Sequence, residues 1–160
     1  MAEESAPAEK IDLSQAVTDA VAKWGPAVTK AVKEGDISDF KALFAPYLVE
    51  VVIQGGDGNE ACFTISDENK EATLDWKTFV DMATADLKEQ DFLKTECQCI
   101  GLLGPRCIME QGRFNNAKEL YHENIAVLTF NDKGQIVAYE AFTDPGVNAV
   151  SELAGQSVTE

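Results

Sequence analysis

The stretch of sequence that decides the fold is FLKTECQCIGLLGPRCIMEQGRFNNAKELYHENIAVLTFNDKGQIVAYEAFTDPG, residues 92–146. Runs rich in β-branched, aromatic and aliphatic residues alternate here with short groups of Gly, Pro, Asn, Asp and Lys, which favour turns. Four such runs occupy residues 92–103, 106–115, 119–130 and 135–144. Because short turns join neighbouring antiparallel strands, this stretch predicts a four-strand meander.

The chain before this meander begins with helical periodicity. Apolar residues recur every three or four positions from Leu13 to Val32, as on one face of an amphipathic helix. The Gly25-Pro26 step predicts either two helical pieces or one kinked helix, because proline lacks a backbone donor. A second helix is expected from Asp36, its cap, to Pro46.

A hairpin and a third helix complete the predicted elements. The runs at residues 47–54 and 60–66 flank a glycine-rich turn, which is typical of a hairpin. Residues 74–89 have the apolar spacing of a helix. The whole order predicts an α+β fold, with a strongly curved antiparallel sheet of about six strands and three main helices on its concave side, forming a conical pocket.

The composition fits one compact domain flanked by tails. The chain has 160 residues, of which 45% are apolar and 26% charged, as in ordinary globular proteins. Residues 1–10 are low in complexity and are predicted to be a tail, disordered or added for expression. Residues 11–146 are expected to form the domain, and residues 147–160 a C-terminal tail.

The net charge and the cysteines limit which partners and which cellular compartment are expected. With 13 Lys and Arg against 28 Asp and Glu, the formal net charge is −15, so neither nucleic acid nor a membrane is an expected partner. No apolar run approaches the roughly 18 residues needed to span a bilayer, and no signal peptide is visible. The four cysteines are expected to be free thiols in the cytoplasm or another reducing soluble compartment.

Two segments resemble a known family. Residues 31–51, AVKEGDISDFKALFAPYLVEV, resemble the opening of SnoaL-like proteins, in which a helix, a Gly-Asp step and a second helix lead into the first strand. Residues 123–145 resemble their closing hairpin, with a Gly-x-Ile step and a terminal aromatic-x-Asp. Over about residues 14–146, the chain looks like a member of the SnoaL-like branch of the nuclear transport factor two-like superfamily.

The resemblance implies a fold more specifically than a reaction. The superfamily includes ketosteroid isomerases, polyketide cyclases, dehydratases and many non-catalytic members. Ketosteroid isomerases carry an Asp base at the end of the first strand, where this chain reads Val51-Val52-Ile53-Gln54. The carbonic anhydrase branch carries a His-rich run on its closing strand, where this chain reads Tyr139-Glu140-Ala141-Phe142-Thr143. Neither of these two chemistries is supported by its motif.

Three residues are candidates for proton transfer. Asp144 matches a recurring Asp of the family at the end of the last strand, and the alternative role is that of a structural turn or rim carboxylate. His122 is the only histidine and shares a strand face with Asn124 and several apolar residues. This pattern fits a pocket lining, and it also fits a surface histidine near the start of a strand.

Glu110 is the third catalytic candidate. A carboxylate among apolar neighbours can be a general base with a raised pKa, or an ordinary ion-pair partner on a solvated face. Alternation places Glu110 on the opposite strand face from Arg113, which joins Met109 and Gln111.

The candidates for ligand binding share a hydrogen-bond donor or an aromatic surface: Asn124, Tyr47, Tyr121, Tyr139, Trp24 and Trp76. Buried tyrosines make hydrogen bonds without any ligand, so a structural role is the alternative. Cys97, Cys99, Cys107 and His122 are numerically enough for a tetrahedral metal site, but no Cys-x-x-Cys knuckle occurs. No phosphate-binding loop occurs either, so no metal and no other cofactor is expected.

The expected function is binding of a small apolar or carbonyl-containing molecule. Its catalytic version is a cofactor-free isomerase, cyclase or dehydratase, and the alternative is a non-catalytic dimerisation or interaction module. The sequence leaves open whether the protein is an enzyme. Residues 100–103 and 125–128 are apolar on both strand faces, so a homodimer through the convex sheet face is also expected.

Overall fold

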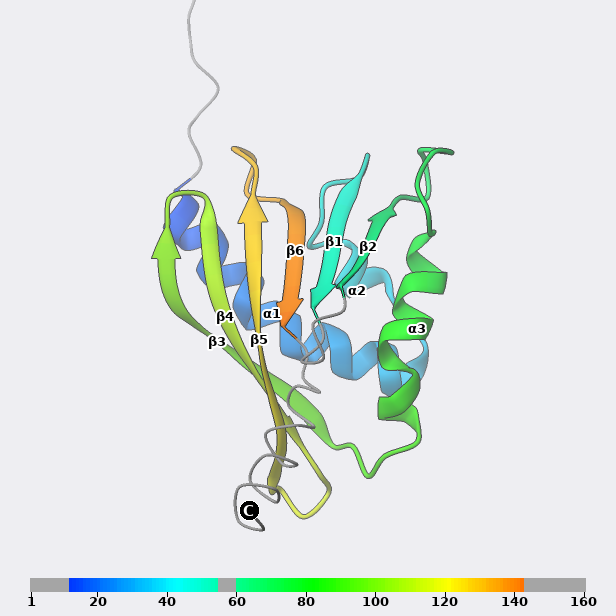
Figure 1. The fold of residues 1–160 in the computed structure, drawn as a ribbon. Helices are drawn as coiled ribbons and strands as arrows, with labels where there is room; N and C mark the ends of the chain where they lie inside the picture. Colours follow the sequence, from blue (N-terminus) through cyan, green and yellow to red (C-terminus); the bar gives the residue numbers. More distant parts are fainter. Residues whose placement is uncertain (1–11, 55–59, 143–160) are drawn as a thin grey trace, which may run out of the picture.

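The computed structural model describes residues 12–54 and 60–142, and the predicted tails lie outside them. The described residues form an α+β structure in which helices pack on one face of a curved six-stranded sheet (Figure 1). In chain order the elements are α1 (Leu13–Glu34), α2 (Ser38–Lys41), β1 (Val49–Gln54), β2 (Glu60–Ile65), α3 (Trp76–Lys88), β3 (Lys94–Leu103), β4 (Arg106–Phe114), β5 (Leu120–Phe130) and β6 (Ile136–Phe142).

The sheet is mostly antiparallel, with the strand order β2-β1-β6-β5-β4-β3. The predicted meander is confirmed as β3 to β6, and Gly104, with a φ of 59°, supplies the tight turn between β3 and β4. The expectation of a wholly antiparallel sheet is wrong at one place, because β1 and β6 run parallel, with Val51 beside Tyr139. Parallel neighbours need a long crossover, which the chain between Gln54 and Ile136 provides.

Helix α1 runs unbroken through Pro26, so the two-piece alternative is not observed. Gly25, next to the proline, lies directly against β3. A Cβ built on Gly25 would come within 2.3 Å of the backbone carbonyl oxygen of Thr95, so only glycine allows this approach. The contact places the middle of α1 against the sheet and fixes the spacing between the two layers.

The second helix is much shorter than the predicted range 36–46. It spans one turn because the following backbone groups pair with β6 instead of continuing the helix. The amide of Ala45 donates to the carbonyl of Ile136 at 2.8 Å, and the amide of Ile136 donates to the carbonyl of Leu43 at 3.1 Å. Competition from the sheet therefore ends α2 early.

Aromatic side chains join the helices to the sheet. The Trp24 ring lies 4.9 Å from Phe40 and 5.2 Å from Tyr139, and Phe44 lies 4.7 Å from Trp76, measured between ring centroids. Such pairs contribute about 0.5–1.5 kcal/mol each beyond the area that they bury. Within the two described segments, no helix is long and apolar enough to cross a membrane.

Candidate functional site

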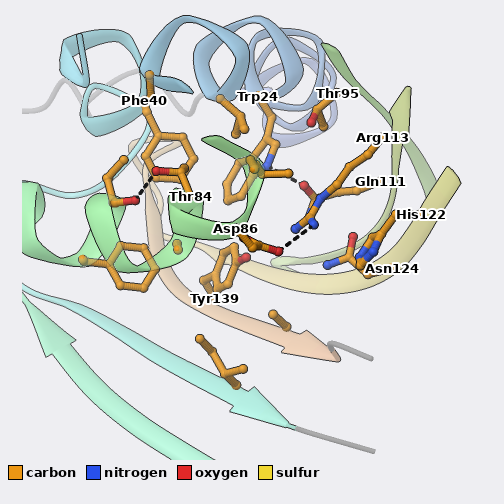
Figure 2. Close-up of a pocket in the computed structure, with 18 residues that line it drawn as sticks. Trp24, Phe40, Thr84, Asp86, Thr95, Gln111, Arg113, His122, Asn124 and Tyr139 are labelled. Atoms are coloured by element: carbon orange, nitrogen blue, oxygen red, sulfur yellow. Dashed lines mark hydrogen bonds and ion pairs between the residues drawn. The ribbon is translucent and has the colours of Figure 1, made fainter. Parts of the chain in front are cut away.

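A cavity of about 380 Å³ lies between α1, α3 and the inner face of the sheet, the face that the helices cover (Figure 2). Its volume is within the usual range for small-molecule pockets. The helices give it a mainly apolar wall, which includes Trp24, Val28, Phe40, Phe79, Val80 and Leu87. The sheet gives it a wall that is polar at one end.

The polar wall is built by strand register. Arg113 on β4 is paired with Thr95 on β3 and with His122 on β5, which makes one row across three strands. Two residues earlier on β4, Gln111 faces Asn124 on β5 in a second row. Because every second residue of a strand shares a face, both rows point to the same side of the sheet. All five side chains line the cavity (Figure 2).

Gln111 is held in place from the apolar side of the cavity. The Trp24 indole Nε1 donates to Gln111 Oε1 at 3.0 Å, and both side chains are buried. The Tyr139 ring stacks on Trp24 at an interplanar angle of 11°. Burial raises the pKa of Tyr139 to about 12, so its hydroxyl stays protonated and can donate to a ligand oxygen.

Arg113 and Asp86 form the one ion pair of the cavity among the described residues. Arg113 Nη1 lies 3.3 Å from Asp86 Oδ2, which reaches over from the last turn of α3. The Arg113 side chain is 18% exposed, whereas the Asp86 side chain is 57% exposed. A half-exposed pair of this kind contributes about 0–1 kcal/mol to the free energy of unfolding. This small contribution does not explain why the guanidinium lies in the cavity.

Three other polar groups of the wall have no hydrogen-bond partner within residues 12–54 and 60–142. Neither the buried Asn124 amide nor the half-buried His122 ring makes such a bond, and the Thr95 hydroxyl is buried without one. By contrast, the Thr84 hydroxyl at the helical wall donates to the carbonyl of Val80 at 2.7 Å. Buried polar groups are normally satisfied, so this wall is prepared for water or for a ligand.

His122 is electrically neutral in this setting. Desolvation of the ring, and next the nearby Arg113 charge, lower the pKa of His122 to about 4, and Asp86 opposes the shift. At neutral pH the ring therefore carries one N–H donor and one nitrogen acceptor. The ring can donate a hydrogen bond, and it can accept a proton as a base weaker than a free imidazole.

Four of the candidates named from the sequence meet in this cavity: His122, Asn124, Tyr139 and Trp24. Five others do not. Glu110 lies on the outer face of β4 and accepts a bond of 3.1 Å from Gln98, and Tyr47 is 66% exposed. The Tyr121 hydroxyl donates to Gln90 at 3.0 Å, and Trp76 is buried in the aromatic core. Asp144 lies outside the described residues.

Sequence reasoning missed Arg113, Gln111 and Asp86 as site residues. Alternation along the strand put Arg113 and Gln111 on one face, but only cross-strand register sets them beside His122 and Asn124. Asp86 carried no signal, because the docking of α3 decides where its carboxylate lies.

No group of three or more His, Cys, Asp or Glu side chains in the described segments is placed to hold a metal ion. The four cysteines are free thiols. Burial raises the pKa of Cys97 and of Cys107 to about 12, which keeps both thiols protonated. Cys107 is part of the apolar core, and Cys97 packs against it.

The fold can be compared with known proteins. No protein-family model matches the sequence, and no curated protein matches it significantly. Among solved structures, the chain is similar to the de novo designed NTF2 fold protein NT-9, at 13% identity and a TM-score of 0.50, over 92% of this chain and 96% of that chain. The chain therefore has the NTF2-like fold, as the resemblance predicted.

Two natural proteins are also similar. BvnE pinacolase from Penicillium brevicompactum matches at 13% identity and a TM-score of 0.48, over 96% of this chain and 98% of that chain. An NTF2-like protein of unknown function from Exiguobacterium sp. 255-15 matches at 14% identity and a TM-score of 0.42, over 78% and 98%. At such identities only the fold is shared, so function has to be argued from the cavity.

Proposed function

We propose that the curved sheet, α1 and α3 form a conical pocket that binds a small molecule with an apolar body and a polar oxygen. The observation that carries the proposal is the division of the cavity into an aromatic wall and a polar wall, on which the side chains of Thr95, His122 and Asn124 have no hydrogen-bond partner among the described residues. The stacked rings of Trp24 and Tyr139 would cover a flat apolar body. Asn124 would donate to a carbonyl oxygen at its end.

The same wall supports a proton-transfer step. A neutral His122 can remove a proton next to a carbonyl, while Asn124 donates to the carbonyl oxygen as negative charge develops there. Both halves of the step use groups of this chain and need no cofactor. The reaction class is therefore a cofactor-free isomerisation, cyclisation or dehydration, with His122 as the base. Glu110 and Asp144 stay sequence-based candidates without a role in this proposal.

Binding is tested by NMR titration of labelled protein with 2-acetylnaphthalene, a flat apolar methyl ketone. We expect shifts at the Trp24 indole and at the side-chain amides of Gln111 and Asn124. Ala83→Phe places a ring at the helical wall of the cavity and should abolish these shifts. Ala85→Phe is the matched control, because Ala85 is also exposed on α3 but does not line the cavity. Equal binding by both variants, or none by the wild type, would contradict the proposal.

Proton transfer is tested on the same ketone in D₂O. The wild type should catalyse exchange of the acetyl protons for deuterium, measured by mass spectrometry. His122→Gln, which keeps a polar side chain but removes the base, should slow the exchange about 100-fold. Exchange at the wild-type rate in this variant would remove His122 from the mechanism.

We also propose that two copies pair through the outer face of the sheet. That face carries a strip of large apolar side chains, each at least 40% exposed: Ile108, Leu120, Ile125 and Phe142. Burial of such a strip favours association, while the net charge of −15 on each chain opposes it, so added salt should favour the dimer.

Light scattering tests the pairing. The wild type should have the mass of two 17.4 kDa chains at micromolar concentration. The double substitution Ile108→Glu and Ile125→Glu should give the mass of one chain, whereas Ala85→Glu on α3 should not change the mass. A monomeric wild type would contradict the dimer and would leave the cavity proposal intact.

A further inference from the structure

The cavity contains one permanent positive charge among the described residues, the guanidinium of Arg113. A guanidinium has five N–H donors in a fixed planar fork. In the described structure one of them is used, by Asp86 at 3.3 Å. Four donors thus lie on the cavity wall without an acceptor among the described residues. Because a guanidinium holds its donors in a fixed planar fork, these donors can take further oxygen acceptors from a ligand.

Asp86 is a weak permanent partner for this fork. It offers one oxygen in a single long contact, and its side chain is 57% exposed to solvent. It also lies in the last turn of α3, where the helix dipole disfavours negative charge. A ligand carboxylate that lies flat against the guanidinium would make two parallel hydrogen bonds and would therefore replace Asp86.

The groups beside Arg113 complete the setting for an anion. His122 and Thr95 flank Arg113 in the same cross-strand row, and both side chains lack a hydrogen-bond partner among the described residues. A neutral imidazole and a hydroxyl can each donate to a carboxylate oxygen. Beyond this row lie Gln111 and Asn124, and the helical side of the cavity is mainly apolar and aromatic.

We propose that the natural ligand of the cavity is a flat apolar acid whose carboxylate pairs with Arg113 in place of Asp86. The inference rests on the proposed small-molecule function and names the class of molecule that the same site takes. The attraction for the acid is short-range. The net charge of −15 repels anions at long range, and the Arg113 guanidinium attracts a carboxylate only once it is inside the cavity. Salt at physiological strength screens the distant repulsion more than the close pair.

The test compares 2-naphthoate with 2-acetylnaphthalene, which has the same ring system with a methyl ketone in place of the carboxylate. Calorimetry at physiological ionic strength gives both dissociation constants, and NMR locates each compound in the cavity. The wild type should bind 2-naphthoate about tenfold more tightly than the ketone. Two variants then separate the contributions of the two charges.

Arg113→Met keeps the apolar stem of the side chain and removes the charge. It should weaken 2-naphthoate binding about tenfold and leave ketone binding within about twofold. Asp86→Asn removes the competing carboxylate from an exposed position and should tighten 2-naphthoate binding about threefold, again with little effect on the ketone. Ketone binding shows that the cavity is intact, so a variant that loses both compounds is unfolded or blocked. Arg113→Lys then supplies the second measurement. It should show an intermediate loss of affinity for 2-naphthoate alone.

The outcomes separate the two proposals. Equal wild-type affinities, or undiminished 2-naphthoate binding in Arg113→Met, would overturn the acid preference while the small-molecule function stands. Failure of both compounds to bind the wild type would overturn the proposed function, and the acid preference with it. Selective loss of 2-naphthoate in Arg113→Met, together with tighter binding in Asp86→Asn, would support the inference.

Discussion

Two halves of the same sheet face differ sharply in this protein. Near the turn between β3 and β4, the inner face carries Cys107, Met109, Ala126 and Leu128, all with 0% exposure. One step further along the same two strands it carries the polar wall, Gln111 and Arg113 on β4 with His122 and Asn124 on β5. The two halves belong to the same pair of strands and differ in the side chains that they carry. The first half supplies stability through burial, and the second half forgoes it by leaving polar groups unsatisfied.

The largest effect on stability is expected when a polar side chain is placed in the apolar half. Leu128→Asn removes buried methyl groups and introduces an amide with no partner, which should lower the free energy of unfolding by about 3–5 kcal/mol. Urea denaturation followed by Trp fluorescence measures the loss. Leu128→Met, which nearly conserves volume, is the control and should cost less than about 1.5 kcal/mol. A small loss in Leu128→Asn would mean that the two halves are equally tolerant of polar groups.

An intermediate effect is expected from acid, and it reports on the polar half alone. The pKa of His122 is lowered to about 4 from the ordinary value of 6.5, so between these values the unfolded chain binds more protons than the folded one. Stability should therefore fall as the pH drops from 6.5 to about 4, and this contribution should level off below that. We expect about 1–2 kcal/mol, less than a fully buried ring would give.

Denaturation at a series of pH values measures this dependence in the wild type and in His122→Gln. The carboxylates titrate over part of the same range in both proteins, so the difference between the two curves isolates the histidine. Parallel curves across the whole range would show that the ring is not desolvated in the folded protein.

The smallest effect on stability is expected from the reverse exchange. Asn124→Leu replaces a buried amide that has no described partner by an apolar side chain of similar size. The free energy of unfolding should change by less than about 1 kcal/mol, in either direction. Ligand binding should suffer instead, as seen in weaker binding of 2-acetylnaphthalene by NMR. A large destabilisation would show that the amide serves the fold and not the cavity.

The sequence predicted the local parts of this contrast well. Alternation on the strand that became β5 grouped His122 with Asn124, and alternation on β4 separated Glu110 from Arg113. Turn residues placed the ends of the meander, and the SnoaL-like resemblance led to the NTF2-like fold. These inferences succeed because side-chain alternation and turn geometry are properties of short segments.

The remaining features depend on how segments meet. Sequence alone did not reveal that β6 lies parallel to β1, which sets Tyr139 against Trp24. Tyr47 and Trp76 were named as ligand-binding candidates, but the first is exposed and the second is buried in the core. An aromatic residue fits an exposed loop, a core or a pocket equally well until the packing is known. Register between strands and the docking of α3 are long-range properties that no local pattern contains.

The position of β6 within the sheet has a consequence for how the protein is made. β6 lies between β1 and β5, so the hairpin and the first three strands of the meander join into one sheet only through a strand that is synthesised after them all. Until residues 136–142 leave the ribosome, two strand edges stay open, and open edges are templates for aggregation. The risk of aggregation is therefore greatest before β6 can join the sheet. The cavity appears last of all, because Tyr139 and Ala141 on β6 close its wall.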